Sequence, residues 1–193
     1  GMDDYVFDGW YDNEKGVGGA YDFTGKTMPA QNITLHAKWV APVHTVTFWQ
    51  GDTKLDEIKD IAHGSKITED RAPKDKVTVV VDEEEFYGWM LADGTPFNFD
   101  TAITKDYELH ARVGSEKGYK LTYSVNGDET LVKDDYHYTK DTPAVVKNYT
   151  PEDEDTDKVF LGWDTSDEGK TVVYKPGATI KMTADTTLHA VFG

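Results

Sequence analysis

Short stretches in which apolar and polar residues alternate run through most of the chain. In residues 33–40, Ile33, Leu35, Ala37 and Trp39 are separated by polar side chains, a pattern typical of a strand with one buried face. Glycines and Asp-Gly, Asn-Gly or Pro-Gly pairs separate such stretches and favour turns. No segment carries an apolar stripe at helical spacing over three turns. The pattern predicts a mainly β protein, α+β at most.

Two motifs occur three times in the same order. Phe-x-Gly-Trp begins at Phe7, Phe86 and Phe160, in steps of 79 and 74 residues, and each copy is followed by a Leu-x-Ala strand. A fixed order at a nearly constant period is the sign of a repeat protein. The motif residues are Phe7, Gly9, Trp10, Leu35, Ala37, Trp39, Phe86, Gly88, Trp89, Leu109, Ala111, Phe160, Gly162, Trp163, Leu188 and Ala190.

The repeat predicts three consecutive regions. Residues 1–41 read as the C-terminal half of a repeat unit, and 42–114 and 115–193 read as two complete units. Because the chain opens in mid-repeat, we expect it to be a fragment of a longer protein. The half unit lacks its opening strands, so residues 5–40 should present an unpaired edge that packs on the second unit or pairs with another chain.

Each complete unit is expected to hold about four strands. The first strands are predicted at 45–49 and 119–123, and the second within 54–61 and at 130–138. A polar loop, the motif strand and the Leu-x-Ala strand follow. In a regularly alternating motif strand, Phe and Gly share one face and Trp lies on the other. The glycine allows a ring or backbone to approach closely, or allows a bulge.

Composition limits how the chain can be stabilised and which partners it can bind. The chain has no cysteine, so stability must come from its 5 Trp, 11 Tyr and 8 Phe rather than from disulfides. The net charge of −16 opposes binding to nucleic acid and to anionic lipid. No apolar run approaches the roughly 20 residues that span a bilayer, so we expect no direct membrane insertion.

The residues needed for catalysis or metal binding are not found together. The sequence has no nucleophile elbow, phosphate loop or zinc-protease motif. His36, His110 and His189 occupy equivalent polar positions of separate units, so they read as solvated strand residues rather than ligands of one ion. The acidic runs 82–85 and 152–157 lack the spacing and glycine of a calcium loop. We predict no catalytic residue, metal site or cofactor, and no enzyme activity.

Three aromatic residues lie off the expected core face. Trp49, Tyr87 and Tyr11 are therefore the candidates for contact with a ligand, and stacking on sugars is one use of such rings.

The two motifs, with the leading alternating strand, resemble the Listeria–Bacteroides repeat, which includes the B-repeats of listerial internalins. The resemblance covers both complete units and the half unit, is closest over 7–40 and is loosest in the third unit. It implies small β-grasp-like units in an elongated tandem chain, as part of an exported bacterial protein at the cell surface or attached to the cell wall. It also implies a role in adhesion or spacing.

The expected function is that of a non-catalytic adhesion or protein-interaction module, or a stalk. The alternative is a carbohydrate-binding module of a surface or secreted protein. The expected partners are a host or matrix protein, a surface glycan and the neighbouring repeat units, and not nucleic acid.

Overall fold

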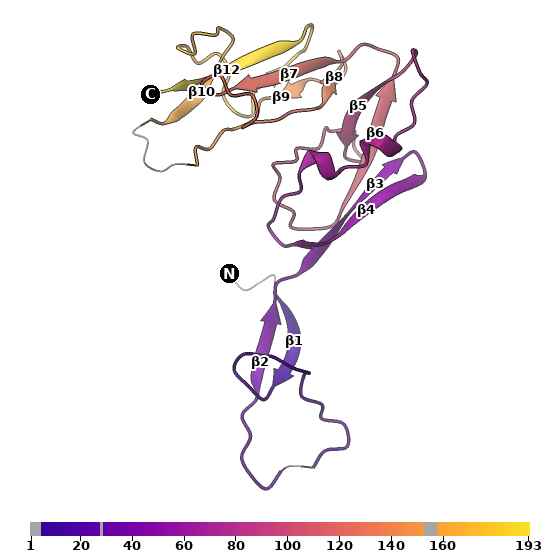
Figure 1. The fold of residues 1–193 in the computed structure, drawn as a ribbon, viewed down its shortest axis with the longest axis vertical. Coiled ribbons are helices and arrows are strands. Elements are labelled where there is room, and N and C mark those ends of the chain that lie inside the picture. Colours follow the sequence, from indigo (N-terminus) through magenta and orange to yellow (C-terminus); the bar gives the residue numbers. More distant parts are fainter. Residues whose placement is uncertain (1–4, 28, 153–157) are drawn as a thin grey trace. The chain divides into compact units, whose positions relative to one another are not determined.

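Strands are the main regular secondary structure of the protein, and turns and irregular segments connect them. The computed structural model describes residues 5–27, 29–152 and 158–193, and in these ranges it contains twelve strands and two single turns of 3-10 helix (Figure 1). The mainly β fold class is confirmed. The chain divides into two compact units. The first comprises 1–46, 58–67 and 100–106, and the second comprises 47–57, 68–99 and 107–193.

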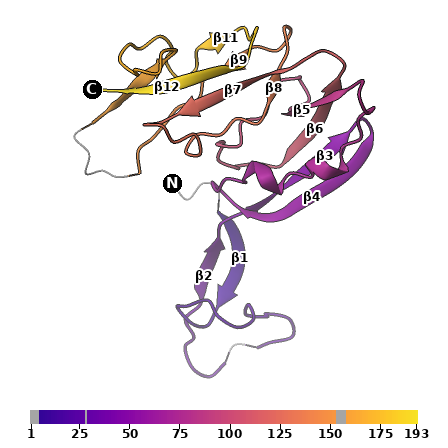
Figure 2. The same cartoon turned by 45° about the horizontal axis from the view of Figure 1, so that its top comes forward.

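The predicted half repeat contains one antiparallel pair. Strand β1 (Val6–Tyr11) pairs with β2 (His36–Val40), and the two form a separate two-stranded sheet (Figure 2). The alternation predicts a closing strand over 33–40. The observed strand β2 begins only at His36, so residues 33–35 lie outside it.

The second predicted repeat supplies a four-stranded sheet in the order β4-β3-β6-β5. Its strands are β3 (Val43–Gln50), β4 (Thr53–Ala62), β5 (Glu85–Met90) and β6 (Tyr107–Gly114). The 3-10 turns η1 (Glu69–Arg71) and η2 (Lys74–Lys76) lie between β4 and β5, in the charged stretch expected to be a loop or one helical turn.

The third predicted repeat supplies another four-stranded sheet, in the order β10-β12-β7-β8, and a separate pair β11-β9. Within the larger sheet, β12 runs parallel to β7 and antiparallel to β10. The strands are β7 (Tyr119–Ser124), β8 (His137–Tyr138), β9 (Ala144–Val145), β10 (Phe160–Asp164), β11 (Thr179–Ile180) and β12 (Thr186–Phe192).

All three motif strands carry the same β-bulge. The register shifts between the Phe and the Gly of each motif, and the glycines have φ of +137° at Gly9, +143° at Gly88 and +149° at Gly162. This conformation is open to glycine and strained for other residues. The prediction that the motif glycine allows a bulge is confirmed.

The bulge corrects the predicted side-chain alternation. Phe and Trp of the motif do not lie on opposite faces, because the inserted residue returns both rings to the same face. Their centroids lie 5.5 Å apart in Phe86–Trp89 and 5.0 Å apart in Phe160–Trp163, edge to face. Such contacts between aromatic rings are favourable beyond the area they bury.

The motif Trp also packs on an aromatic residue of the leading strand in both complete repeats. Phe48 of β3 lies 5.0 Å from Trp89, and Tyr123 of β7 lies 4.8 Å from Trp163, centroid to centroid. Trp163 is fully buried, and its indole N–H donates a hydrogen bond of 2.8 Å to the Lys147 carbonyl. These rings link the leading strand to the motif strand across the closing strand.

Turn chemistry explains one confirmed and one wrong prediction. Asn126-Gly127 forms the expected tight turn, with positive φ at both residues. Of the predicted strand 130–138, only β8 is formed, because side-chain carboxylates accept hydrogen bonds from backbone N–H groups that a strand would use for pairing. Asp128 accepts from the Thr130 N–H at 2.7 Å, and Asp134 accepts from the Tyr136 N–H at 3.1 Å.

The structure leaves some expectations open. The β-grasp description and the boundaries 1–41, 42–114 and 115–193 stay predictions. The acidic run 152–157 lies outside the described residues from 153 onward.

We predict that Trp163→Ala lowers the free energy of unfolding by roughly 3–5 kcal/mol, since it empties a fully buried site and leaves the Lys147 carbonyl without its donor. Trp10→Ala is the matched control. Trp10 occupies the same motif position but is 43% exposed, so its removal should have a much smaller effect. Chemical denaturation of both variants measures the difference. Equal losses would contradict the packing described above.

Candidate functional site

The second and third predicted repeats meet within the second compact unit, and Tyr87 lies at their junction. It occupies the inserted position of the β5 bulge, is 3% exposed and belongs to the same apolar cluster as Tyr123 and Trp163 of the third repeat. Its hydroxyl donates a hydrogen bond of 2.5 Å to the Glu116 carbonyl. The prediction that Tyr87 is exposed is therefore wrong: the bulge directs it away from Trp89 and into contact with the next repeat.

Further side chains join the two repeats at this junction. His137 Nδ1 lies 2.7 Å from Glu85 Oε1. The Arg112 guanidinium donates a hydrogen bond to the Thr142 hydroxyl. The Tyr136 ring lies directly against Gly88, where a Cβ atom would overlap it. The motif glycine of the second repeat thus makes room for an aromatic ring of the third, and the expected close approach of a ring to this glycine is confirmed.

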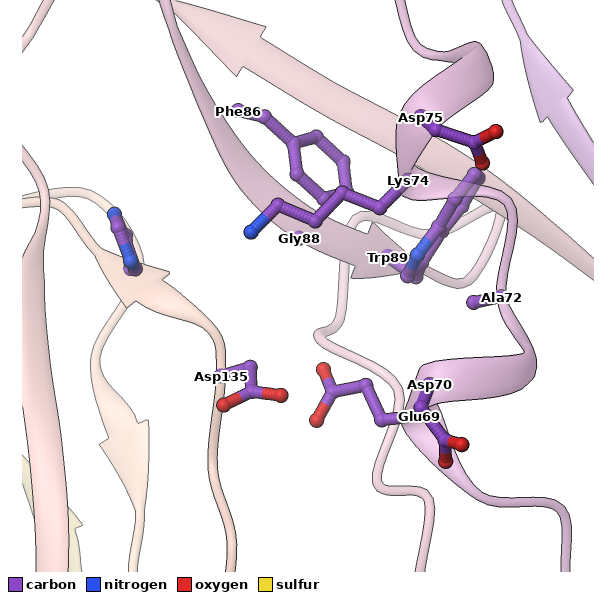
Figure 3. Close-up of a pocket in the computed structure, with 10 residues that line it drawn as sticks. Glu69, Asp70, Ala72, Lys74, Asp75, Phe86, Gly88, Trp89 and Asp135 are labelled. Atoms are coloured by element: carbon purple, nitrogen blue, oxygen red, sulfur yellow. The ribbon is translucent and has the colours of Figure 1, made fainter.

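A cavity of about 540 Å³ opens beside these contacts (Figure 3). Phe86 and Trp89 of β5 supply aromatic surface, and the carboxylates of Glu69 and Asp135 point toward one another from the two repeats. The lining residues are Glu69, Asp70, Ala72, Lys74, Asp75, Phe86, Gly88, Trp89, Asp135 and His137. We call this cavity the junction pocket.

The pocket favours a protonated Glu69. The pKa of the Glu69 carboxyl is raised to about 7, mainly by burial and also by the nearby carboxylates of Asp135 and Asp134, while the Lys147 ammonium acts in the opposite direction. The Lys74 side chain also reaches the pocket. A positively charged group placed between Glu69 and Asp135 would relieve the repulsion between the two carboxylates and ionise Glu69.

This arrangement is chemically suited to a basic side chain. An apolar stem can lie along aromatic surface while its charged end reaches carboxylates, as lysine and arginine side chains do elsewhere. In the part of the chain that the structure describes, no three His, Asp or Glu side chains form a group that could hold a metal ion.

The other two predicted ligand-facing aromatics differ from each other. Tyr11 is 5% exposed, and its hydroxyl donates a hydrogen bond of 2.7 Å to Asp8, so its expected exposure is wrong. Trp49 is half-buried, and its indole N–H donates to the Thr47 hydroxyl oxygen at 2.9 Å. Trp49 keeps part of its surface available to a ligand.

Sequence reasoning missed the residues that form the pocket. Glu69 and Asp135 lie in separate predicted loops of different repeats, and nothing in their spacing connects them. One feature of the sequence could have indicated that the two repeats pack together. At the position between the motif Phe and Gly, the second repeat has the aromatic residue Tyr87, whereas the first repeat has Asp8. A ring of that size indicates a covered surface. Sequence reasoning also missed the pairing of His44 and His63, whose ring nitrogens lie 2.9 Å apart.

Comparison with known proteins places the repeat motifs in a family. The Listeria-Bacteroides repeat domain matches residues 2–38 and 119–191, which together make up more than half of the chain. The chain belongs to the Listeria-Bacteroides repeat family. The match includes the third repeat, which was expected to differ most from the family pattern. It does not include the second repeat. The second repeat nevertheless shares the bulged register of the other two.

Two relatives of the Listeria-Bacteroides repeat chain are much longer proteins. A putative membrane protein of Evansella cellulosilytica is 31% identical over 82% of this chain and 22% of its own length. Internalin H of Listeria monocytogenes is 39% identical over 50% of this chain and 16% of its own length. The chain thus spans less than a quarter of either relative. No solved structure matches it.

The search for membrane-spanning helices gave a negative result. None of the helices among the described residues combines the length and the apolar character needed to cross a bilayer.

We predict that Glu69→Gln stabilises this repeat protein at high pH. The ordinary carboxyl pKa of 4.5 governs the unfolded chain, whereas the folded chain holds the proton to about pH 7. The folded state therefore binds more protons between these values, and stability falls as the pH rises through that window. Gln does not ionise, so the variant should exceed wild type by about 2 kcal/mol above pH 7 and equal it at pH 4.

Denaturation curves at several pH values measure this effect, with the exposed Glu83→Gln as the control for loss of one charge. A stability difference that does not change with pH would contradict the assignment of the raised pKa to Glu69.

We also predict that Gly88→Ala separates the unfolding of the second and third repeats. A side chain there is strained by φ of +143° and overlaps the Tyr136 ring, so the expected loss is roughly 1–3 kcal/mol. The control is Gly19→Ala, because a Cβ at Gly19 meets no atom within 4 Å and its φ is outside the strained range. A single cooperative transition with unchanged midpoint would contradict the coupling of the repeats through Gly88.

Proposed function

We propose that the chain is a non-catalytic adhesion or protein-interaction module of an exported bacterial surface protein. The family and the similarity to internalin H support the surface setting. The junction pocket is the observation that carries a recognition role, because carboxylates from two repeats converge there beside the Phe86 ring. The partner is a protein that inserts a lysine or arginine side chain.

Charge on the rest of the chain supports the same partner. The net charge of −16 attracts basic proteins and speeds their encounter with the module. Within the pocket, four acidic side chains, Glu69, Asp70, Asp75 and Asp135, outnumber Lys74. A basic side chain therefore gains more on entry than a neutral sugar hydroxyl does.

A stalk is the second candidate function, and the interlocked junction favours it. The Arg112–Thr142 hydrogen bond, the Glu85–His137 contact and the ring of Tyr136 against Gly88 tie neighbouring repeats together. A chain joined in this way can hold another domain at a distance from the cell wall. The carbohydrate-binding alternative has less support, because Tyr87 and Tyr11 are buried and Trp49 alone of the three candidates keeps exposed surface.

The test is a binding screen of the immobilised chain at physiological salt. The panel contains basic and acidic host matrix proteins and a set of glycans. We expect saturable binding to a basic protein, weakened roughly tenfold or more by Glu69→Gln with Asp135→Asn. The matched control is Glu129→Gln with Asp141→Asn, which removes the same formal charge from exposed positions away from the pocket.

The other outcomes point to the alternatives. Equal losses in the two double variants would show attraction by overall charge and overturn the pocket assignment. A glycan hit that Trp49→Ala abolishes would favour the carbohydrate-binding module. No binding across the whole panel would favour the stalk.

A further inference from the structure

Two histidines of the first compact unit are brought into contact by the ends of neighbouring strands. His44 is the second residue of β3, and His63 directly follows the last residue of β4. Nε2 of His44 lies 2.9 Å from Nδ1 of His63, and the ring centroids are 5.1 Å apart. The two residues stand 19 positions apart in the sequence, so no metal-binding spacing indicates their contact.

Backbone hydrogen bonds fix the segments that carry these rings. The His63 N–H donates to the Pro42 carbonyl at 3.1 Å, just before β3 begins. The next residue, Gly64, donates to the Ile103 carbonyl at 2.8 Å, and Ile103 is fully buried. The side chain of His44 keeps only 12% of its surface exposed. The two imidazoles therefore meet on a constrained scaffold and not on a free loop.

A carboxylate stands on the other side of the His44 ring. Oδ1 of Asp106 lies 3.8 Å from Nδ1 of His44 and accepts a hydrogen bond of 2.8 Å from the Thr45 N–H. A carboxylate beside one ring nitrogen favours the tautomer that carries its proton on that nitrogen. With the proton on Nδ1, the Nε2 atom of His44 has a lone pair, and this lone pair faces His63.

We propose that His44 and His63 form a binding site for a divalent transition-metal ion, and that Cu²⁺ is the ion bound most tightly. Imidazole nitrogens suit copper, nickel and zinc, and Cu²⁺ has the highest affinity in this series. Two nitrogens bonded to one ion at about 2.0 Å lie about 2.8 Å apart at a right angle and about 3.3 Å apart at a tetrahedral angle. The observed separation of 2.9 Å is close to the right-angle value of a tetragonal Cu²⁺ site.

A small change converts the histidine contact into the metal site. In the contact as it stands, Nδ1–H of His63 donates to Nε2 of His44. The ion takes the place of that proton, and His63 then carries its single proton on Nε2, so both rings stay neutral. The Asp106 carboxylate beside Nδ1–H of His44 orients that ring and makes its Nε2 a stronger ligand, as second-sphere carboxylates do for metal-bound histidines.

The chain supplies two ligands and not a closed set. Since no three His, Asp or Glu side chains of the described residues form a metal-binding group, water or a donor atom of another molecule fills the remaining positions. An open site of this kind binds one ion per chain in an exchangeable way. The two histidines belong to a different compact unit from the junction pocket, and the proposal does not depend on the proposed function.

The experiment titrates the whole chain with Cu²⁺ in the presence of excess Mg²⁺, which occupies exposed carboxylates without competing for imidazole nitrogen. We expect saturable binding of one Cu²⁺ per chain and an electron paramagnetic resonance spectrum with two coordinated imidazole nitrogens. In proton NMR, substoichiometric Cu²⁺ should broaden the ring signals of His44 and His63 before those of the other histidines. Neither spectrum needs a variant, so both decide the matter even where a substitution unfolds the chain.

Variants assign the ligands. His63→Gln and His44→Gln should each weaken Cu²⁺ binding roughly tenfold or more, since each removes one of two ligands. The matched control is His110→Gln, because His110 is a half-buried strand histidine outside the site. Asp106→Asn tests the carboxylate as a positioning residue: the amide oxygen can still accept the Thr45 N–H, whereas the affinity for Cu²⁺ should fall by up to about tenfold.

Three results would overturn the proposal. One is Cu²⁺ binding that His63→Gln weakens no more than His110→Gln does. Another is a wild-type resonance spectrum with fewer than two imidazole nitrogens, which would show an adventitious ion held by carboxylates or by the terminal amino group. The third is the absence of saturable Cu²⁺ binding in excess Mg²⁺.

Discussion

The edge-to-face packing of the motif Trp on a leading-strand aromatic residue is the interaction on which each complete repeat depends. The contact requires the motif Phe and Trp to share a face, and the glycine bulge makes that arrangement. Where Phe48 or Tyr123 is present, the motif Trp is buried and the closing strand is long. In the first predicted repeat, whose described residues include no such ring from a leading strand, the same Trp is 43% exposed and the closing strand is short. The three motif copies thus act as an internal comparison of one core with and without its key ring.

Much of the fold follows from local patterns in the sequence. The alternation in 45–49 and 119–123, the Asn126-Gly127 turn and the repeated motif led to the correct strands, because period-two alternation and positive φ are local properties. The bulge reversed the expected faces of Phe and Trp, since one inserted residue shifts every later side chain. The strand expected at 130–138 was lost to Asp128 and Asp134, whose carboxylates accept the N–H groups that a ladder would use.

The candidate site was less predictable, because it forms between repeats. Glu69 and Asp135 meet only when two repeats pack together, and no periodicity encodes that distance. Tyr87 was misread because its burial depends on the neighbouring repeat and not on its own strand. The equivalent residue of the third repeat, Leu161, is 46% exposed, so one motif position is buried or exposed according to what lies beside it. In repeat proteins the interfaces between units contribute to stability along with the units themselves.

The parallel pairing of β7 with β12 has a mechanical consequence. The first strand of the third repeat and its last strand are neighbours in one sheet and run in the same direction. Tension that enters through the start of β7 and leaves through the end of β12 pulls the two strands along their length. Their hydrogen bonds are then loaded together in shear instead of breaking one after another from an end. Such a repeat resists unfolding most strongly when the pulling force acts between its first and last strands.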